Sequence, residues 1–278
     1  MFVLATPRSG FLLRGIFMGD SSLSQLLSVM QRLRDPEQGC EWDKQQTFST
    51  IAPYTLEECY EVLDAINRQD FIDLKQELGD LLYQIVFYAQ MASEQGIFTF
   101  EDICQAITQK LIRRHPDVFT TTQPTADWEK IKQQERHQKR QFSLLDDIPH
   151  AMPALLRADK IQQRCQTVGF DWETLGPVVD KVKEELDEVM EEAIKVEQDP
   201  ERIEEELGDL LFATVNLTRH LGSRAETALH KANLKFERRF RDVEKKVAAQ
   251  GLTLDQATLA QMELAWQQVK QDEKNNGH

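Results

Sequence analysis

The sequence predicts an all-α protein that consists of two homologous helical domains in tandem. Apolar residues recur at steps of three and four, as in residues 22–33 with Leu23, Leu26, Leu27 and Met30. No segment shows the period of two that is typical of an amphipathic strand. One ordered set of motifs also occurs twice along the chain, which indicates an internal duplication.

Local signals predict where the helices of the first half begin and end. Asp35-Pro36 ends the first helix. Thr55, with Glu58 three residues later, has the pattern of a capping box, so we expect the next helix to begin there. A long helix should follow over about 70–92, with Gly96 just beyond it. The apolar stripe of the middle helix, expected in the core, is Leu56, Tyr60, Leu63 and Ile66.

The repeated motifs keep their order and nearly the same separation in the two halves. The matches are E-E-x-x-E at 57–61 and 184–188, E-L-G-D-L-L at 77–82 and 206–211, K-x-x-R-R at 110–114 and 235–239, W-x-x-x-K at 128–132 and 266–270, and Trp42-Asp43 with Phe170-Asp171. We therefore predict an N-terminal extension over 1–20, a first domain over 21–140, a linker over 141–155 and a second domain over 156–278.

The composition narrows the classes of function. The chain has 47 acidic and 33 basic side chains and a net charge of -14. The electrostatic field of this net negative charge repels nucleic acid and anionic membrane surfaces, so phosphate ligands would need a mediating cation. No apolar run approaches the ~20 residues that span a bilayer, and the four cysteines lack metal-site spacing. We expect a cytoplasmic protein with reduced thiols and no nucleic-acid or membrane partner.

Acidic side chains form the strongest candidate site. Glu57, Glu58 and Glu61 share a helix face opposite the apolar stripe, and Glu77 and Asp80 lie three apart on the next helix. Carboxylates that converge from two helices repel one another unless a divalent cation lies between them. An oxygen-only ligand set suits Mg²⁺ better than zinc. A single E-E-x-x-E could be a solvated helix face, but its repetition with E-L-G-D favours a metal site.

Three further residues in these helices carry weaker signals. Gly79 and Gly208 lie inside helices, where glycine costs ~1 kcal/mol relative to alanine, which indicates close approach of a backbone or ligand. Asn216 shares the helix strip of the second E-L-G-D motif. It could bind a metal, water or a sugar hydroxyl, or it could satisfy a neighbouring backbone group.

Two pairs near the C-terminus each have two interpretations. Lys235 and Arg239 share a helix face and could bind phosphate oxygens, or they could pair with neighbouring glutamates on an exposed face. Trp266 could stack on a base, with Lys270 on phosphate, or the indole could pack the last helix onto the core. The glycine motifs of P-loop and Rossmann phosphate sites are absent from the sequence.

E-E-x-x-E followed by E-x-x-D in an all-helical chain resembles the MazG family of nucleoside triphosphate pyrophosphohydrolases. The duplicated arrangement is similar to the full-length bacterial form of this family. The motifs that carry this resemblance are C-E-W-D-x-x-Q-T at 40–47, L-G-D-L-L-F-A-x-V-N at 207–216 and K-F-E-R-R-F at 235–240. The resemblance covers about residues 23–274. Glu41 is a departure, because the family usually has proline there.

The resemblance implies a set of site residues. Magnesium ligands in the second domain would be Glu185, Glu188, Glu206 and Asp209, with first-domain counterparts Glu58, Glu61, Glu77 and Asp80. Contacts to nucleotide would come from Lys181, Val182, Lys183, Glu184, Arg202, Glu205, Lys235, Arg238, Arg239, Trp266 and Lys270. The family also implies a homodimer, with sites formed by helices packed across subunits.

The activity expected is hydrolysis of nucleoside triphosphates to monophosphate and pyrophosphate, in house-cleaning or regulation of nucleotide pools. Bound Mg²⁺ would lower the pKa of a water that Glu184 or Glu185 orients or deprotonates. The alternatives are a nucleotide sensor that does not hydrolyse and an acidic helical interaction protein. We expect the second domain to be the main catalytic one, because Lys181, Lys183 and Asn216 are replaced in the first by Tyr54, Leu56 and Phe87.

Overall fold

The computed structural model describes residues 21–119, 131, 135, 136, 138 and 140–275. The secondary structure of these residues is helical, and none of them lies in a strand. None of the described helices has a stretch long and apolar enough to cross a bilayer. The chain forms two compact units, Met1–Ala126 and Asp127–His278. The all-α class predicted from the sequence is confirmed.

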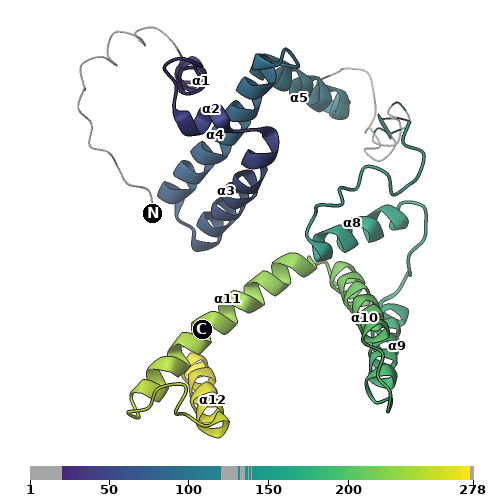
Figure 1. Cartoon of the computed structure of the whole chain (residues 1–278). Coiled ribbons are helices and arrows are strands. Elements are labelled where there is room, and N and C mark those ends of the chain that lie inside the picture. The colour runs from purple at the N-terminus through teal and green to yellow at the C-terminus, as the bar shows by residue number, and fades with distance from the viewer. Residues whose placement is uncertain (1–20, 120–130, 132–134, 137, 139, 276–278) are drawn as a thin grey trace. The chain divides into compact units, whose positions relative to one another are not determined.

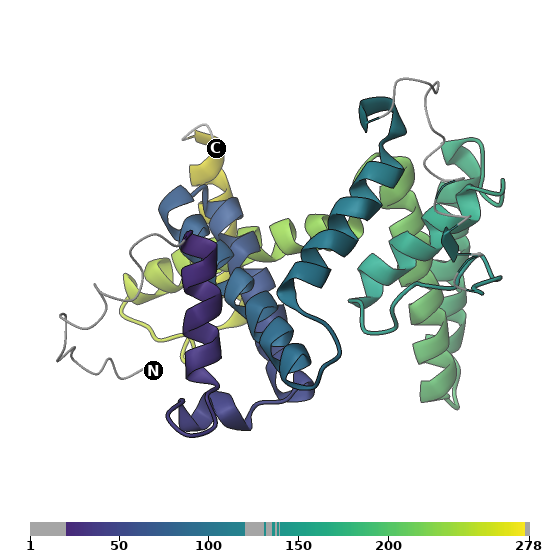
Figure 2. The same cartoon turned by 90° about the horizontal axis from the view of Figure 1, so that it is seen from above.

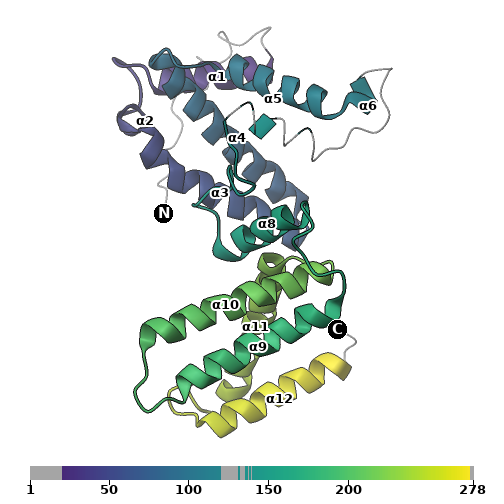
Figure 3. The same cartoon turned by 90° about the vertical axis from the view of Figure 1, so that its right-hand side faces the viewer.

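The first unit is organised around the α3–α4 pair (Figures 1 and 3). Its helices are α1 (Ser22–Leu33), α2 (Glu41–Gln45), α3 (Phe48–Arg68), α4 (Phe71–Glu94), α5 (Phe100–Arg114) and α6 (Pro116–Phe119). The dark purple helix α1 packs against α4, as Figure 2 shows from above, and α5 also contacts α4. The buried core cluster consists of Met30, Ile51, Val86, Phe87 and Met91.

The second unit repeats the paired-helix arrangement. Its helices are α8 (Ala154–Gln166), α9 (Leu175–Ala193), α10 (Pro200–His220), α11 (Ala225–Ala248) and α12 (Leu259–Asn275). Helices α9 and α10 lie side by side, and α8 packs on α10 (Figures 1 and 3). Helix α12 lies beside the C-terminal part of α11, with the core cluster Val243, Val247, Ala265 and Val269 between them.

Helix boundaries follow the local signals except at one position. Ser21 caps α1 and Asp70 caps α4, as their side chains accept backbone N–H groups of the first turn. Thr55 was expected to begin the middle helix, but this is wrong, because Thr47 and Thr50 form a capping box that starts α3 at Phe48. Thr55 therefore lies within α3, where its hydroxyl is 2.8 Å from the Tyr88 hydroxyl.

The apolar stripe of α3 is not buried within the chain, which corrects the expectation that it joins the core. Leu56, Tyr60, Leu63 and Ile66 are 50–55% exposed. The core side of α3 is formed instead by Ile51 and Ala65, which are fully buried. Helical periodicity identifies an apolar face but does not say which surface covers it.

The predicted linker, 141–155, packs within the second unit. Ile148 is buried, and Arg164 of α8 donates a hydrogen bond of 2.9 Å to the Leu144 carbonyl. The division between the two units falls earlier, after Ala126. The predicted extension 1–20 and the Trp128-x-x-x-Lys132 motif lie outside the described residues.

Candidate metal and nucleotide site

The second unit brings three of its four predicted metal ligands together. Glu185 and Glu188 come from α9 and Glu206 from α10, and one carboxylate oxygen of each lies within 4.8 Å of the others. We call these three residues the second acid cluster. Glu185 is only 4% exposed. Asp209, one turn along α10 from Glu206, is exposed and lies outside the cluster.

Two basic side chains neutralise part of the second acid cluster. Lys181 Nζ lies 2.6 Å from Glu185 Oε1 and 2.9 Å from Glu184 Oε1. Hydrogen bonds to these two glutamates raise the pKa of Lys181. Arg202 binds Glu206 at 3.1 Å and Glu205 at 2.6 Å. Lys181 and Arg202, two of the cations that were predicted to contact nucleotide, therefore lie directly beside the predicted metal ligands.

The second acid cluster fits a hard divalent cation. The Glu185 Oε2 atom is buried and has no hydrogen-bond partner among the described residues, an arrangement that costs free energy unless a ligand completes it. Desolvation and the neighbouring Glu185 carboxylate raise the pKa of Glu188, because the two carboxylates share one space. A donor set of carboxylate oxygens alone suits such an ion.

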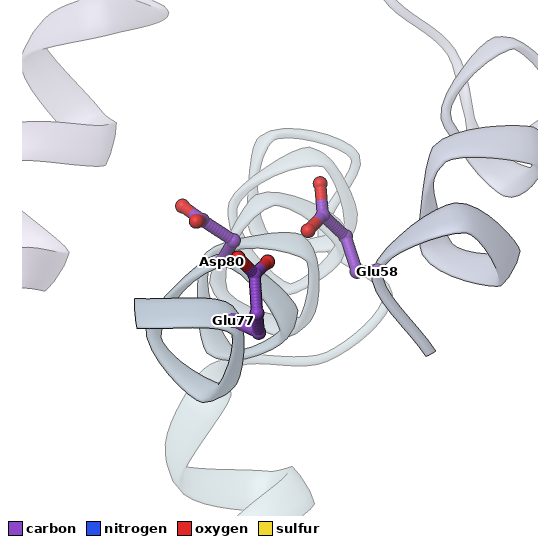
Figure 4. A group of neighbouring side chains, drawn as sticks. All are labelled: Glu58, Glu77 and Asp80. Carbon is purple, nitrogen blue, oxygen red and sulfur yellow. The ribbon is translucent and has the colours of Figure 1, made fainter. Parts of the chain in front are cut away.

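The first unit forms a matching group from α3 and α4. Glu58, Glu77 and Asp80, which we call the first acid cluster, each place a carboxylate oxygen within 4.8 Å of the others. In Figure 4 the Glu77 carboxylate lies between those of Asp80 and Glu58. Desolvation and the neighbouring Glu61 carboxylate raise the pKa of Glu77 to about 7. Desolvation and the Asp80 carboxylate raise the pKa of Glu58.

The charges around the first acid cluster differ from those around the second. In the aligned motifs, Tyr54 stands where the second half has Lys181, and Asp73 stands where it has Arg202. The Asp73 carboxylate adds to the repulsion that raises the pKa of Glu77. Among the described residues, no ion pair joins a basic side chain to this cluster.

The mid-helix glycines are not explained by close packing within the chain. A Cβ atom added at Gly79 or Gly208 would meet no atom within 4 Å apart from the adjacent residues and the backbone of its own helix. Both positions are exposed on the helices that carry the acid clusters. The expectation that another backbone approaches these glycines closely is therefore wrong for contacts among the described residues.

The other predicted nucleotide contacts on α9 are less closely tied to the cluster. Lys183 is exposed and pairs with Asp180 at 3.1 Å. Val182 is half-buried on α9.

The predicted contacts on α11 and α12 form a separate group. Arg238 and Arg239 both bind Glu273, at 2.8 and 2.7 Å, rather than neighbouring glutamates on α11. The Trp266 ring lies 5.3 Å from the Phe236 ring and packs on the α11–α12 core. Of the two interpretations of Trp266, the contacts within this chain therefore support packing of the last helix onto the core. Lys235 is exposed and Lys270 half-buried on the same two helices.

A pocket beside α10 was not expected from the sequence. Its walls come from α8, from residues 169–172 and from the C-terminal half of α10, with Asn216 and Arg219 among the lining residues. Asn216 accepts a hydrogen bond of 2.6 Å from Arg219, which satisfies its carbonyl oxygen with a side chain rather than a backbone group. The aromatic and acidic cluster G-F-D-W at 169–172 was the signal that could have indicated it.

Comparison with known proteins agrees with the repeated architecture. The model of the MazG nucleotide pyrophosphohydrolase domain matches twice, over residues 46–119 and 174–244. These two segments contain the first and second acid clusters, respectively.

Similar proteins cover nearly the whole chain. A protein of Escherichia coli K12 named nucleoside triphosphate pyrophosphohydrolase is 64% identical, over 91% of this chain and 98% of its own length. A Thermotoga maritima protein named nucleoside triphosphate pyrophosphohydrolase/pyrophosphatase MazG is 43% identical, over 88% of this chain and 94% of its own. The crystal structure of a mazG-related protein from Thermotoga maritima is 25% identical, with a TM-score of 0.34, over 40% of this chain and 98% of its own. On its two domain matches and these full-length relatives, the chain belongs to the MazG family of nucleotide pyrophosphohydrolases.

Proposed function

We propose that this chain hydrolyses nucleoside triphosphates to the monophosphate and pyrophosphate, and that the second unit performs most of this reaction. The observation that carries the proposal is the environment of Glu185. Its buried carboxylate has one oxygen bound by Lys181 and the other without a partner among the described residues. A cation and a phosphate ligand would together satisfy this arrangement. The names of the full-length relatives support the same reaction.

Glu185, Glu188, Glu206 and Asp209 would hold Mg²⁺, with Asp209 completing the set from its exposed position on α10. When bound, the ion would neutralise phosphate charge and acidify a coordinated water. Glu184 has a side chain that is 56% exposed. We assign it the role of orienting the attacking water and accepting its proton at a carboxylate oxygen.

Lys181 and Arg202 would exchange their glutamate partners for phosphate oxygens. Such charge-assisted contacts stabilise the negative charge that builds up on the departing pyrophosphate. Val182 and Lys183 follow Lys181 on α9, and Glu205 already binds Arg202 at 2.6 Å. The cations of α11 and α12, with Trp266, remain predicted contacts to nucleotide.

A second copy of this chain would cover the apolar surface that one copy leaves exposed. The α3 stripe is exposed, and in the second unit Leu186, Met190, Leu207 and Leu211 are 44–57% exposed. Contiguous apolar surfaces of this kind are typical of protein interfaces. Sedimentation should therefore give a dimer. Replacement of Leu63 and Ile66 by glutamate should shift it towards the monomer, whereas a monomeric unaltered protein would contradict the proposal.

We also place this activity in the cytoplasm, as house-cleaning or regulation of nucleotide pools. All four cysteines are free. Reduced thiols of this kind are typical of cytosolic proteins.

The test is a product assay on the full chain with a mixture of nucleoside triphosphates, with and without Mg²⁺. Monophosphate and pyrophosphate should form in equal amounts, and only with the ion. Diphosphate plus orthophosphate as first products would refute the cleavage position. Mg²⁺-dependent binding without turnover would identify a sensor, and neither binding nor turnover would favour an acidic interaction protein.

A further inference from the structure

Two arginines of α11 converge on a single carboxylate of α12, outside the second acid cluster. Nη2 of Arg239 donates to Oε2 of Glu273 at 2.7 Å, and its Nε donates to Oε1 at 3.2 Å. Arg238 donates to the same Oε1 atom at 2.8 Å. The hydrogen bonds from these arginines lower the pKa of Glu273 to about 2, so its carboxylate is charged at neutral pH.

The Arg239 guanidinium also lies over the indole of Trp266. Its central carbon is 5.8 Å from the centroid of the ring, which is a cation–π distance. Trp266 in turn lies against Phe236 and packs on the α11–α12 core. Because a carboxylate fixes the plane of the guanidinium and an aromatic ring limits its position, Arg239 keeps few of the rotamers that a free arginine samples.

This arrangement leaves part of Arg239 available to a ligand. Among the described residues, the hydrogen bonds of Arg239 use its Nε and Nη2 atoms. The Nη1 atom therefore keeps two N–H donors. Two guanidinium groups share the single negative charge of Glu273, so the group of three side chains keeps a net positive charge. A cation that is already oriented binds phosphate oxygens with less loss of side-chain freedom than a mobile one.

Helical spacing places the carboxylate beside the predicted nucleotide contacts. Trp266, Lys270 and Glu273 follow at steps of four and three, so they share one face of α12. The first half of the sequence repeats the pattern W-x-x-x-K-x-x-E at 128–135, after its own K-x-x-R-R at 110–114. The glutamate is therefore a member of the duplicated motifs rather than an isolated surface residue.

The packing of α12 on α11 does not depend on this arrangement. The two helices share a buried apolar core, and a second ion pair joins them, from Lys246 to Asp272 at 2.8 Å. Ion pairs near the surface contribute little to stability, and a single arginine would be enough to form one. The convergence of Arg238 and Arg239 on Glu273 therefore indicates a role beyond holding the two helices together.

We propose that Glu273 is a positioning residue, which holds the Arg239 guanidinium beside Trp266 in the orientation in which it binds nucleotide. The inference rests on the proposed function, in which Arg239 and Trp266 are predicted contacts to nucleotide. Glu273 acts through Arg239 and does not itself touch the substrate. Loss of its charge should therefore weaken nucleotide binding, although simple electrostatics predicts that an anionic ligand binds better when a neighbouring negative charge is removed.

Binding and turnover of the full chain test the sign of this effect. The binding probe is α,β-methylene-ATP with Mg²⁺, whose α–β linkage resists hydrolysis. Glu273→Gln should weaken its binding ~3- to 10-fold, because the ligand must then order Arg239 itself. In turnover, KM should rise by a similar factor while kcat stays within about twofold, because a contact made equally in the ground and transition states changes KM alone. Glu273→Asp should recover part of the affinity.

Asp272→Asn is the matched control, because it removes the other ion pair between the same two helices. It should leave the affinity for the analogue within about 1.5-fold of the unaltered chain, and melting curves of every variant would reveal any folding defect. A double-mutant cycle then tests whether Glu273 acts through Arg239. Arg239→Gln alone should weaken binding about tenfold or more. In that background, Glu273→Gln should add less than about twofold, because both changes remove the same contact.

Several results would overturn the inference. Tighter binding in Glu273→Gln would show that Glu273 competes with nucleotide for the arginines. Equal weakening in Asp272→Asn would show that Glu273 has only a structural role. A full loss on adding Glu273→Gln to Arg239→Gln would show that it does not act through Arg239. Unchanged affinity and KM in Glu273→Gln would refute this inference alone, whereas an unaltered chain that neither bound the analogue nor released pyrophosphate would refute the proposed function as well.

Discussion

The α3–α4 and α9–α10 pairs carry the same acidic motifs but place them among different charges. In the second unit, Lys181 and Arg202 bind the carboxylates of the cluster. In the first, Tyr54 and Asp73 occupy these positions, and repulsion raises the pKa of Glu77 to about 7. The comparison teaches that the same acidic motif can lie beside basic side chains in one unit and without them in the other.

The two units also differ at one aligned position on α4 and α10. Phe87 is part of the first core, whereas Asn216 lines a pocket. Among the described residues, basic side chains paired with an acid cluster and a polar residue at this helix position thus occur together in the second unit. We expect the first unit to have kept a cation site and to serve stability or assembly more than catalysis.

The largest effect should come from removing two predicted metal ligands from one unit at a time. Glu185→Gln with Glu188→Gln should lower pyrophosphate release at least ~10²-fold, because the site loses both ion and electrostatic stabilisation. The matched pair, Glu58→Gln with Glu61→Gln, should keep most of the activity. Circular dichroism would establish that both variants fold. Equal losses, or the reverse order, would break the proposed difference between the units.

A smaller effect is expected from the basic residues alone. Lys181→Ala should lower kcat/KM ~10- to 100-fold, since one charged contact to the departing pyrophosphate is lost, and Lys181→Arg should retain more. Tyr54→Ala, at the aligned position, should change kcat/KM by less than about twofold. A marked loss in Tyr54→Ala would show that the first unit also turns over substrate.

Metal binding should stabilise both units, and the first one more. A ligand at 100 times its Kd stabilises the folded state by about 2.7 kcal/mol, and calorimetry with Mg²⁺ or chelator would measure the corresponding rise in Tm. The first acid cluster has no bound basic side chain among the described residues, so an ion relieves more repulsion there. Glu58→Gln with Glu61→Gln should therefore reduce the Mg²⁺-dependent rise more than the second-unit pair does.

The smallest effect is a pH dependence in the metal-free protein. The pKa of Glu77 is raised to about 7, above its unfolded value of ~4.3, so the folded state binds the proton more tightly. Its contribution to stability is fully present below the unfolded pKa and is lost as pH rises through about 7. In chelator, Tm should fall from pH 5 to 8, and Glu77→Gln should flatten the curve. A flat curve in the unaltered protein would contradict this.

Several features were accessible from the sequence because their causes are local. The helices expected over 22–33 and from about 70 have these starts because the Ser21 and Asp70 side chains cap them through bonds to the next turn, and Asp35-Pro36 follows the end of the first. The duplicated acids were placed correctly on paired helices, because a helix fixes which residues share a face. The expectation that Thr55 begins a helix was wrong, because the capping box of Thr47 and Thr50 starts α3 at Phe48.

By itself, then, the sequence determined the helices, the duplication, the all-α class and the acid motifs that indicate a cation. These depend on spacing along the chain and on interactions within one or two helical turns. Only the tertiary structure decided that Glu206 meets Glu185 while Asp209 stays outside, that the α3 stripe stays exposed, and that the Asn216 strip borders a pocket. Those outcomes depend on which side chains other helices bring into the same space, and periodicity contains no information on that.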